Sequence, residues 1–193
     1  MTNRNEEIAA YFRNMDRSFF MDTDKELARF DEAIPIGHGQ TISQPSLVLK
    51  MTQLLDIKPD AKVLEIGTGS GFQTALLAAF SKQVYTVERV EPLYERVQER
   101  LRAAGYDNIR FRLGDGTDGW EDHAPYDRIM VTAAASIVPP ALIHQLDAGG
   151  KMLIPVGSRF MQELQLIEKD RQGNVQTTVY DLVRFVPLRG QYE

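Results

Sequence analysis

Short apolar runs alternate with longer amphipathic segments through the middle of the chain. The apolar runs lie at 63–66, 84–87, 109–113, 129–132 and 151–155, and each has the length of one buried β-strand. Apolar positions at helical spacing follow at 74–80, 93–104 and 140–146. This alternation predicts an α/β fold, in which a doubly wound, mostly parallel sheet carries helices on both faces.

The two ends of the chain have different patterns. Helical spacing of apolar residues predicts a helix over about 6–20, and a second helix begins near Pro45, after a glycine-bearing loop at 34–40. Two longer runs, 163–169 and 175–186, flank a polar turn and predict an antiparallel hairpin that closes one edge of the sheet. We therefore expect one domain with an N-terminal helical extension and a C-terminal hairpin.

Composition excludes several classes of function. The chain has 193 residues, of which 43% are hydrophobic and 25% are charged, as in ordinary globular proteins. No apolar run approaches the roughly 20 residues that span a bilayer, so we expect no membrane partner. The net charge is −5 and no basic stripe is present, which argues against a nucleic-acid partner.

The residue types that bind metals or form disulfides are scarce. Cysteine is absent, which excludes disulfides and a thiolate nucleophile, and the three histidines have no paired ligand spacing, so no metal site is predicted. The N-terminal residues lack the apolar stretch of a secretory signal. These observations together predict a cytoplasmic protein.

The strongest chemical signal is a glycine loop directly after the first buried strand, Val63-Leu64-Glu65-Ile66-Gly67-Thr68-Gly69-Ser70-Gly71. Its spacing is G-x-G-x-G, which differs from the dinucleotide fingerprint, and no Lys-Ser or Lys-Thr pair follows as in a phosphate-binding loop. Glu65 places an acid before the first glycine, which suits a cationic ligand with an ammonium end and repels pyrophosphate. The loop therefore favours S-adenosyl-L-methionine over NAD or ATP.

Two acidic residues follow the next two predicted strands. Glu88 ends the second strand, where an acid accepts hydrogen bonds from ribose hydroxyls in dinucleotide folds. Asp115 follows the third strand and could accept from an adenine amino group, while Gly116 lets the ring approach the backbone. Taken singly, Glu88 is also consistent with a solvated charge, and Asp115 with a turn. Their joint spacing behind the glycine loop favours a binding site.

These residues resemble the class I methyltransferases, and longer motifs resemble one family among them, the protein-L-isoaspartate O-methyltransferases. The motifs are Ile34-Pro35-Ile36-Gly37-His38-Gly39-Gln40-Thr41-Ile42-Ser43-Gln44-Pro45, then 126–135, Ile154-Pro155-Val156-Gly157, 162–164 and 184–188. The resemblance implies methyl transfer from S-adenosyl-L-methionine to the α-carboxylate of L-isoaspartyl residues in damaged proteins. S-adenosyl-L-homocysteine is then the product, and closure of the ester to a succinimide begins the repair.

The same resemblance assigns roles to individual residues. Ser43 is implied as the active-site residue, with Gln40, Thr41 and Ile42 beside the methyl group. Thr132, Ala133, Val156 and Gly157 are implied to form the groove for the peptide substrate. From residue type alone, Ser43 is also a candidate helix cap ahead of Pro45. We expect a monomer, divided into the extension (1–33), the active-site loop and helix (34–61), the cofactor-binding core (62–155) and the hairpin (156–193).

Other functions stay open at this stage. A divergent member of the same family could act on another carboxylate or a small molecule, since 15–20 differs from the family's Val-Pro-Arg-Glu-like turn. A nucleic-acid amino methyltransferase is disfavoured, because Val131-Thr132-Ala133-Ala134 stands where an Asn or Asp followed by Pro-Pro and an aromatic residue is expected. A module that binds the cofactor without turnover is a further alternative.

Overall fold

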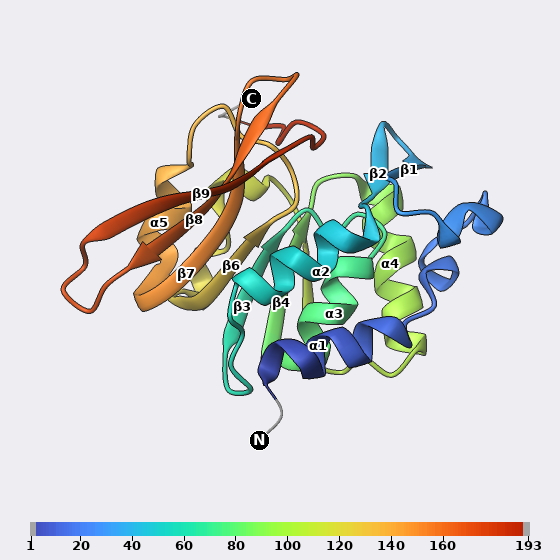
Figure 1. The fold of residues 1–193 in the computed structure, drawn as a ribbon, viewed down its shortest axis with the longest axis horizontal. Helices are drawn as coiled ribbons and strands as arrows, with labels where there is room; N and C mark the ends of the chain where they lie inside the picture. Colours follow the sequence, from blue (N-terminus) through green and yellow to red (C-terminus); the bar gives the residue numbers. More distant parts are fainter. Residues whose placement is uncertain (1–2, 191–193) are drawn as a thin grey trace.

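The computed structural model describes residues 3–190, and these contain a seven-stranded sheet with the order β5-β4-β3-β6-β7-β8-β9 (Figure 1). The strands are β3 (Lys62–Ile66), β4 (Gln83–Glu88), β5 (Ile109–Leu113), β6 (Tyr126–Val131), β7 (Leu146–Gly157), β8 (Gln162–Lys169) and β9 (Val175–Val183). The first five strands in this order, from β5 to β7, pair in parallel, whereas β8 pairs antiparallel with both β7 and β9. In chain order, β4 and β5 follow β3 toward one edge of the sheet, and β6 to β9 then lie on the other side of β3. A topological switch point, where ligands bind in such sheets, therefore lies between β3 and β6.

The helices occupy the connections that the sequence pattern predicts. The α-helices of residues 3–190 are α1 (Arg4–Arg13), α2 (Pro45–Leu54), α3 (Phe72–Phe80), α4 (Glu91–Ala103) and α5 (Pro140–Gln145). Short 3₁₀ helices are η1 (Arg17–Phe20), η2 (Lys25–Arg29), η3 (Gly116–Asp118) and η4 (Glu121–His123). A separate two-stranded hairpin consists of β1 (Ile34–Gly37) and β2 (Gln40–Ile42). In the part that the structure describes, no helix is long and apolar enough to cross a membrane.

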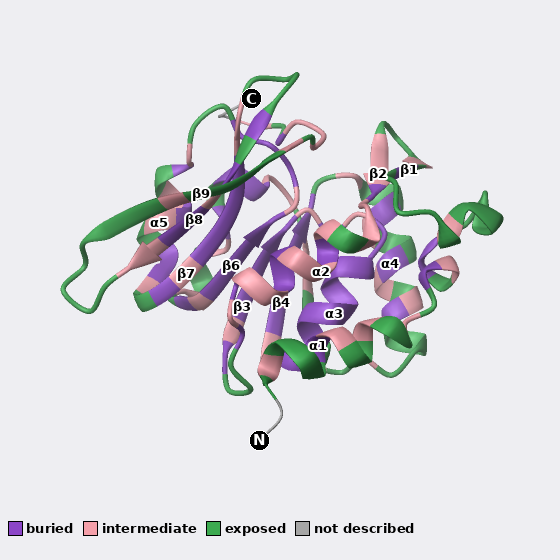
Figure 2. Cartoon of the chain, in the orientation of Figure 1, coloured by how far each residue is buried: buried purple, intermediate pink, exposed green. Residues whose placement is uncertain are grey.

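The core is divided by the sheet into two apolar clusters. Neighbouring strand residues point to opposite faces, so Val63 packs with residues of α1 to α4 and Leu64 packs with the cluster that includes Leu142 of α5. Figure 1 shows α1, α2 and α3 together on one face of the strands. Figure 2 shows the central strands buried, while β9 is exposed along most of its length. The predicted doubly wound fold with an antiparallel C-terminal hairpin is confirmed.

Several predicted boundaries are wrong, for local reasons. The N-terminal helix ends at Arg13 and not near residue 20, because Asp16 starts a new turn by accepting a hydrogen bond from Ser18 N at 2.9 Å. Strand β7 begins at Leu146, five residues before the predicted start, with an irregularity in its pairing to β6. The loop at 34–40 forms most of the β1–β2 hairpin, whose turn is made by residues with positive φ at Gly37, His38 and Gly39. The division of the chain into four functional parts stays a prediction.

Candidate active site

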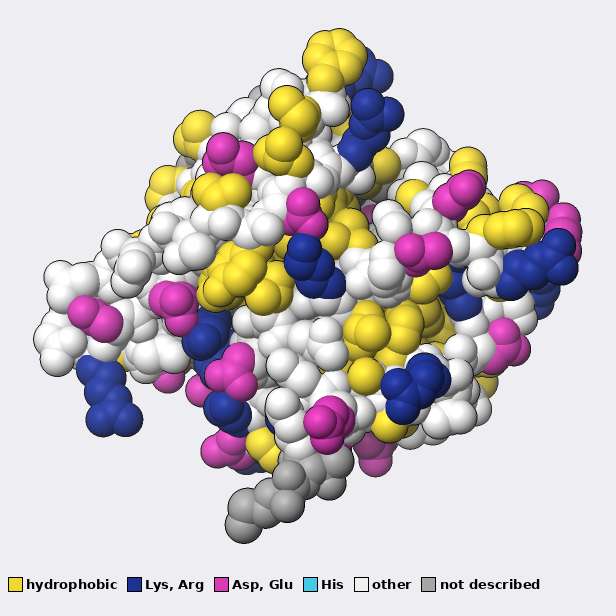
Figure 3. Space-filling view, viewed as in Figure 1, with side chains coloured by type: hydrophobic (Ala, Val, Ile, Leu, Met, Phe, Trp, Pro, Cys, Tyr) yellow, Lys and Arg dark blue, Asp and Glu magenta, His cyan; other side chains and the backbone are white. Residues whose placement is uncertain are grey.

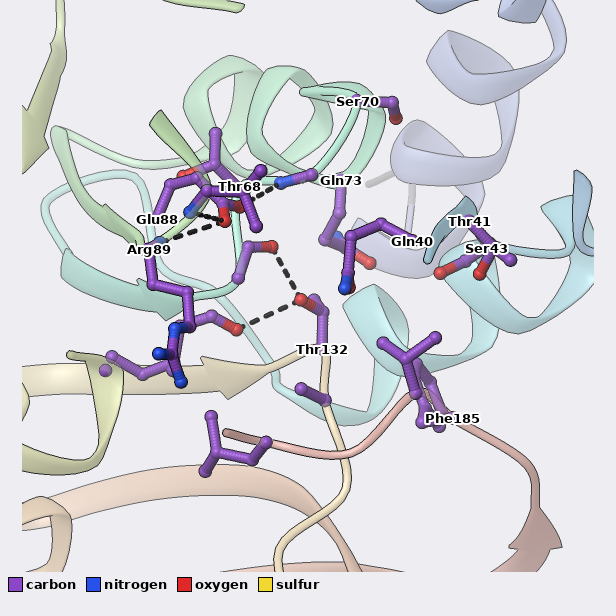
Figure 4. Close-up of a pocket in the computed structure, with 18 of the residues that line it drawn as sticks. Gln40, Thr41, Ser43, Thr68, Ser70, Gln73, Glu88, Arg89, Thr132 and Phe185 are labelled. Atoms are coloured by element: carbon purple, nitrogen blue, oxygen red, sulfur yellow. Dashed lines mark hydrogen bonds between the residues drawn. The ribbon is translucent and has the colours of Figure 1, made fainter. Parts of the chain in front are cut away.

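The glycine loop connects the carboxyl end of β3 to the first turn of α3, where Gly71 is the N-cap. Gly67 has φ 96°, and a Cβ atom there would collide with Oγ1 of Thr132. That hydroxyl donates to the carbonyl oxygens of Ile66 at 3.0 Å and Gly67 at 2.6 Å, as the dashed lines in Figure 4 show. Only glycine combines this conformation with this contact. The backbone of the loop is thereby fixed against β6.

Glu88 at the end of β4 holds the other side of the loop. Its carboxylate accepts hydrogen bonds from the backbone N–H groups of Gly69 at 2.8 Å, Arg89 at 2.9 Å and Val90 at 2.8 Å. The side chain is 7% exposed and lines a cavity beneath the loop. Each carboxylate oxygen has two lone-pair directions, so Oε2, which binds only Gly69 N–H, keeps one for a ligand. This geometry suits the predicted contact with a ribose hydroxyl.

The loop after β2 carries Thr41 and Ser43 to the opposite edge of the cavity. Figure 4 shows these two side chains close together, with Gln40 directed between them and the glycine loop. Within residues 3–190, the Ser43 hydroxyl has no hydrogen-bond partner, although its carbonyl accepts from Arg17 Nη2 at 3.0 Å. The interpretation of Ser43 as a helix cap is wrong. Gln44 precedes the first turn of α2, and Asp31 accepts the Ser46 N–H at 2.8 Å.

The far wall of the cavity comes from the C-terminal end of the chain. After β9, residues 185–189 run beside the loop that follows β6, because Ala134 N donates to Val186 O at 2.8 Å and Leu188 N donates to Ala134 O at 2.7 Å. Phe185 N is held in turn by Oε1 of the buried Gln162 at 2.8 Å. The wall is therefore built from segments that lie far apart in the sequence.

These elements enclose a cavity of about 420 Å³, a volume within the usual range for sites that hold a small-molecule ligand. Its lining includes most of the predicted site residues: Gln40, Thr41, Ser43, Gly67, Thr68, Gly69, Ser70, Glu88, Gly116, Thr132 and Ala133. The cavity also lies at the carboxyl ends of β3 and β6, at the switch point of the sheet. The structure thus brings the glycine loop and the Ser43 loop to one site.

Other predicted site residues do not line this cavity. Ile42 is 1% exposed and packs in the core, and Gly71 lies against Val97 of α4. Asp115 uses Oδ1 to accept from Thr117 N at 2.9 Å and Thr117 Oγ1 at 2.8 Å. Val156 and Gly157 pair with β8 on one side and with Ala135 on the other, so their backbones are occupied by the sheet. None of these five residues lines the smaller cavity, so their predicted direct contacts with ligand or peptide stay predictions.

Glu65 is the clearest departure from the expected lining. Its side chain is fully buried on the α3 side of β3, where Oε2 accepts from Thr74 Oγ1 at 2.6 Å and Thr86 Oγ1 at 2.7 Å, while Oε1 is unpaired. Burial raises the pKa of Glu65 from 4.5 to about 8, so the carboxyl is largely protonated near neutral pH. A neutral group beneath the loop does not supply the charge expected for attracting an ammonium group.

A second hollow adjoins the first at the Ser43 loop. It has a volume of about 680 Å³ and shares Thr41, Ser43 and Phe185 with the smaller cavity. Its other walls come from α2, the turn between β7 and β8, and the end of β9, and they include Leu47, Lys50, Phe160, Met161, Asp181 and Leu182. Figure 3 shows apolar side chains gathered over β9 and beside α2. We call this hollow the outer groove.

Comparison with known proteins shows the family and the fold of the chain. The chain matches, over residues 1–193, the family model described as protein-L-isoaspartate(D-aspartate) O-methyltransferase. The chain belongs to this family. A relative from a Polaromonas species, named protein-L-isoaspartate O-methyltransferase 2, is 53% identical over 188 residues, which cover 96% of this chain and 89% of the relative. The resemblance seen in the sequence motifs is therefore confirmed at the level of the family.

Solved structures of the family have the same fold. One protein-L-isoaspartate O-methyltransferase superposes with a TM-score of 0.88 at 24% identity, covering 98% of this chain and 62% of the other. A beta-aspartate methyltransferase from Plasmodium falciparum, solved in complex with S-adenosyl-L-homocysteine, gives a TM-score of 0.78 at 24% identity, with 98% and 99% covered. The fold of the present chain is thus that of the family.

Sequence reasoning missed part of the lining. Phe185 to Arg189, His38, Gln73 and Arg89 all face the smaller cavity. The only signal for the C-terminal wall was the match of 184–188 to a family motif, which carried no assigned role. The outer groove, formed from α2, β9 and the β7–β8 turn, was not predicted from the sequence, and the predicted peptide groove at Thr132, Ala133, Val156 and Gly157 stays a prediction.

Proposed function

We propose that this protein transfers a methyl group from S-adenosyl-L-methionine to the α-carboxylate of L-isoaspartyl residues in damaged proteins or peptides. The observation that carries the proposal is the junction of the two hollows at Thr41, Ser43 and Phe185. A ligand-sized cavity behind the loop and a larger open groove in front of it give the two substrates separate places that meet at Ser43. Membership of the family supports the same reaction.

The residues around the smaller cavity fit the cofactor. When bound, S-adenosyl-L-methionine supplies an electrophilic methyl group and leaves as S-adenosyl-L-homocysteine. Glu88 keeps an unused acceptor direction for a ribose hydroxyl, and Gly67 and Gly69 present backbone without side chains. Gly116, which lines the cavity beside Ile66, leaves space for a flat ring against the backbone. Gln40, Thr41 and Ser43 are proposed to surround the reacting end of the ligand.

The chemistry asks little of the protein as a base. A peptide carboxylate has a pKa near 3.5 and is already ionised at neutral pH, so no residue has to remove a proton. The free Ser43 hydroxyl is suited to hold one carboxylate oxygen while the other attacks. Orientation and exclusion of water then supply most of the acceleration. The methyl ester subsequently loses methanol as the neighbouring backbone nitrogen closes the succinimide ring.

The outer groove supports a peptide as the acceptor. Phe160, Met161 and Leu182 are 78%, 57% and 59% exposed, so their side chains are available to a chain that lies along the groove. Lys50 Nζ and Asp181 Oδ2 form an exposed ion pair at 2.6 Å in the same wall. An open groove with apolar and charged walls suits an extended polypeptide better than a small molecule, which is usually largely enclosed. Apolar residues next to the isoaspartyl site should therefore favour binding.

The decisive experiment uses labelled S-adenosyl-L-methionine and two peptides that differ only in an aspartyl or isoaspartyl linkage. We expect label and released methanol from the isoaspartyl peptide alone. Equal labelling of both peptides would refute the linkage specificity. Calorimetric binding of S-adenosyl-L-homocysteine without labelling of either peptide would favour a divergent methyltransferase for another carboxylate or a small molecule. A cytoplasmic location, a monomeric state and the lack of nucleic-acid or membrane partners stay predictions from the sequence.

A further inference from the structure

Arg17, at the start of η1, is a charged residue buried among backbone carbonyls. Its side chain is 5% exposed. Nη1 donates to the carbonyl oxygens of Ala28 at 3.3 Å and Phe30 at 2.9 Å, and Nη2 donates to that of Glu32 at 2.6 Å. Burial lowers the pKa of Arg17, against which the nearby Asp31 acts to raise it. Burial of a charged group is costly unless hydrogen bonds compensate it, so these bonds to backbone carbonyls are required to keep the guanidinium buried.

The same guanidinium reaches the loop that carries Ser43. Nη2 donates to Ser43 O at 3.0 Å and more weakly to Ile42 O at 3.4 Å. Arg17 thus joins two segments, 28–32 and 42–43, between which the described residues form no backbone–backbone hydrogen bond. Arg17 thus holds the backbone carbonyl of Ser43, whose hydroxyl has no hydrogen-bond partner within residues 3–190.

The segment that Arg17 holds supplies a second anchor to the loop. Asp31 accepts the backbone N–H of Ser46 at 2.8 Å and the side-chain amide of Gln44 at 2.9 Å. These bonds lower the pKa of Asp31, so its carboxylate is charged at neutral pH. Arg17 and Asp31 therefore fix the chain on the two sides of Gln44, one through a carbonyl and the other through an N–H group. The orientation of Ser43 depends on both.

A third contact of the N-terminal segment is weaker. Asp22 pairs with Arg96 at 2.6 Å and with Arg100, whose Nη1 donates to Ser70 O in the glycine loop at 3.4 Å. The Asp22 carboxylate is 40% exposed, and ion pairs of this kind contribute little because solvent screens them. The buried cluster at Arg17, not the surface pairs at Asp22, should therefore decide how the segment acts on the site.

We propose that Arg17 is a positioning residue for methyl transfer: its guanidinium fixes the backbone at Ser43 and orders the Asp31 segment, and thereby aims the Ser43 hydroxyl at the acceptor carboxylate. The proposal rests on the proposed function. The planar fork of arginine places donors toward both segments at once, whereas the single ammonium of lysine cannot span them with the same geometry. Arg17→Lys should keep the charge and lose the alignment.

The test compares Arg17→Lys and Arg17→Met with Arg13→Met. The control removes an exposed arginine four residues earlier whose side chain forms no hydrogen bond or ion pair within residues 3–190. Each variant is measured for binding of S-adenosyl-L-homocysteine, for kcat and KM with the isoaspartyl peptide, and for amide hydrogen exchange along the chain. We expect kcat to fall by about a hundredfold in both Arg17 variants, as for a misplacement near 1 Å, with cofactor affinity nearly unchanged. Exchange should accelerate at 28–47 only, and Arg13→Met should match the wild type.

Outcomes are separable from those of the proposed function. In a further variant, Arg17→Gly, guanidinium ion at tens of millimolar should restore part of the lost kcat. The same concentration should leave the kcat of Arg13→Gly unchanged, and sodium chloride serves as the ionic control. Unchanged kcat in Arg17→Lys, or faster exchange spread over the whole core, would overturn the proposal, as would loss of the folded state in both Arg17 variants. If the wild type methylates no isoaspartyl peptide, the proposed function fails, while unaltered exchange at 28–47 in Arg17→Lys still refutes the positioning role by itself.

Discussion

Replacement of Glu88 by glutamine tests how the end of β4 binds the cofactor. In the wild type, Oε1 accepts the N–H groups of Arg89 and Val90, and Oε2 accepts that of Gly69. A glutamine oxygen can take the place of Oε1, but its NH₂ group then faces the N–H of Gly69, and two donors oppose each other. The variant also presents no acceptor to a ribose hydroxyl at that position.

The structure sets the size of both effects. One lost hydrogen bond to a charged, largely buried carboxylate costs about 1.5–3 kcal/mol, so the free energy of unfolding of Glu88→Gln should fall by about that amount. Loss of a hydrogen bond of the same strength to the ribose hydroxyl should raise the Kd for S-adenosyl-L-homocysteine about 10- to 100-fold, because about 1.4 kcal/mol corresponds to a factor of ten.

Calorimetry and urea unfolding measure the two quantities separately. Glu95→Gln, an exposed position on α4, is the matched control and should leave both unchanged. An analogue of the ligand that lacks the ribose hydroxyls should bind wild type and Glu88→Gln with similar affinity. The reasoning fails if Glu88→Gln binds S-adenosyl-L-homocysteine as tightly as the wild type. Lower stability with unaltered affinity would reduce Glu88 to a support for the loop.

Three further predictions follow from single side chains. Gly67→Ala should lower the free energy of unfolding by more than Gly105→Ala. Both glycines have positive φ, which costs an alanine about 1–2 kcal/mol at either position, but only the new Cβ at Gly67 collides with Thr132. Equal losses of stability in urea unfolding would contradict this. Glu65 has a folded-state pKa of about 8, above its unfolded value of 4.5, so its contribution to the free energy of unfolding is full below pH 4.5 and decreases by about 1.4 kcal/mol per pH unit until pH 8. Glu65→Gln should remove this slope, and parallel stability curves for the two proteins would count against it. Ser43→Ala should lower kcat/KM for the isoaspartyl peptide by about 10- to 100-fold without loss of stability, since the hydroxyl has no partner among residues 3–190; full turnover in the methyl-transfer assay would exclude the proposed contact.

Local patterns in the sequence determined the order and type of most elements. The apolar runs and the glycine loop predicted the doubly wound sheet and the placing of the loop after β3, because strand length, helical spacing and glycine conformation depend on neighbouring residues. The alternation did not reveal which face Glu65 takes. A strand buried on both faces is apolar along its whole length, without alternation. The pattern of apolar residues therefore does not show whether Glu65 points toward α3 or toward a ligand.

Contacts between distant segments decided the rest. Asp31 caps α2 in place of Ser43, Gln162 holds Phe185, and Arg17 reaches the Ser43 loop, each across a separation that no local pattern records. The hollow between α2 and β9 likewise brings together segments far apart in the sequence, while the backbone at Val156 pairs with β8 and Ala135. The sequence alone therefore determined the fold, the family and the chemistry of the cofactor loop. Only the tertiary structure determined which polar groups are already bound within the protein and which are left for substrates.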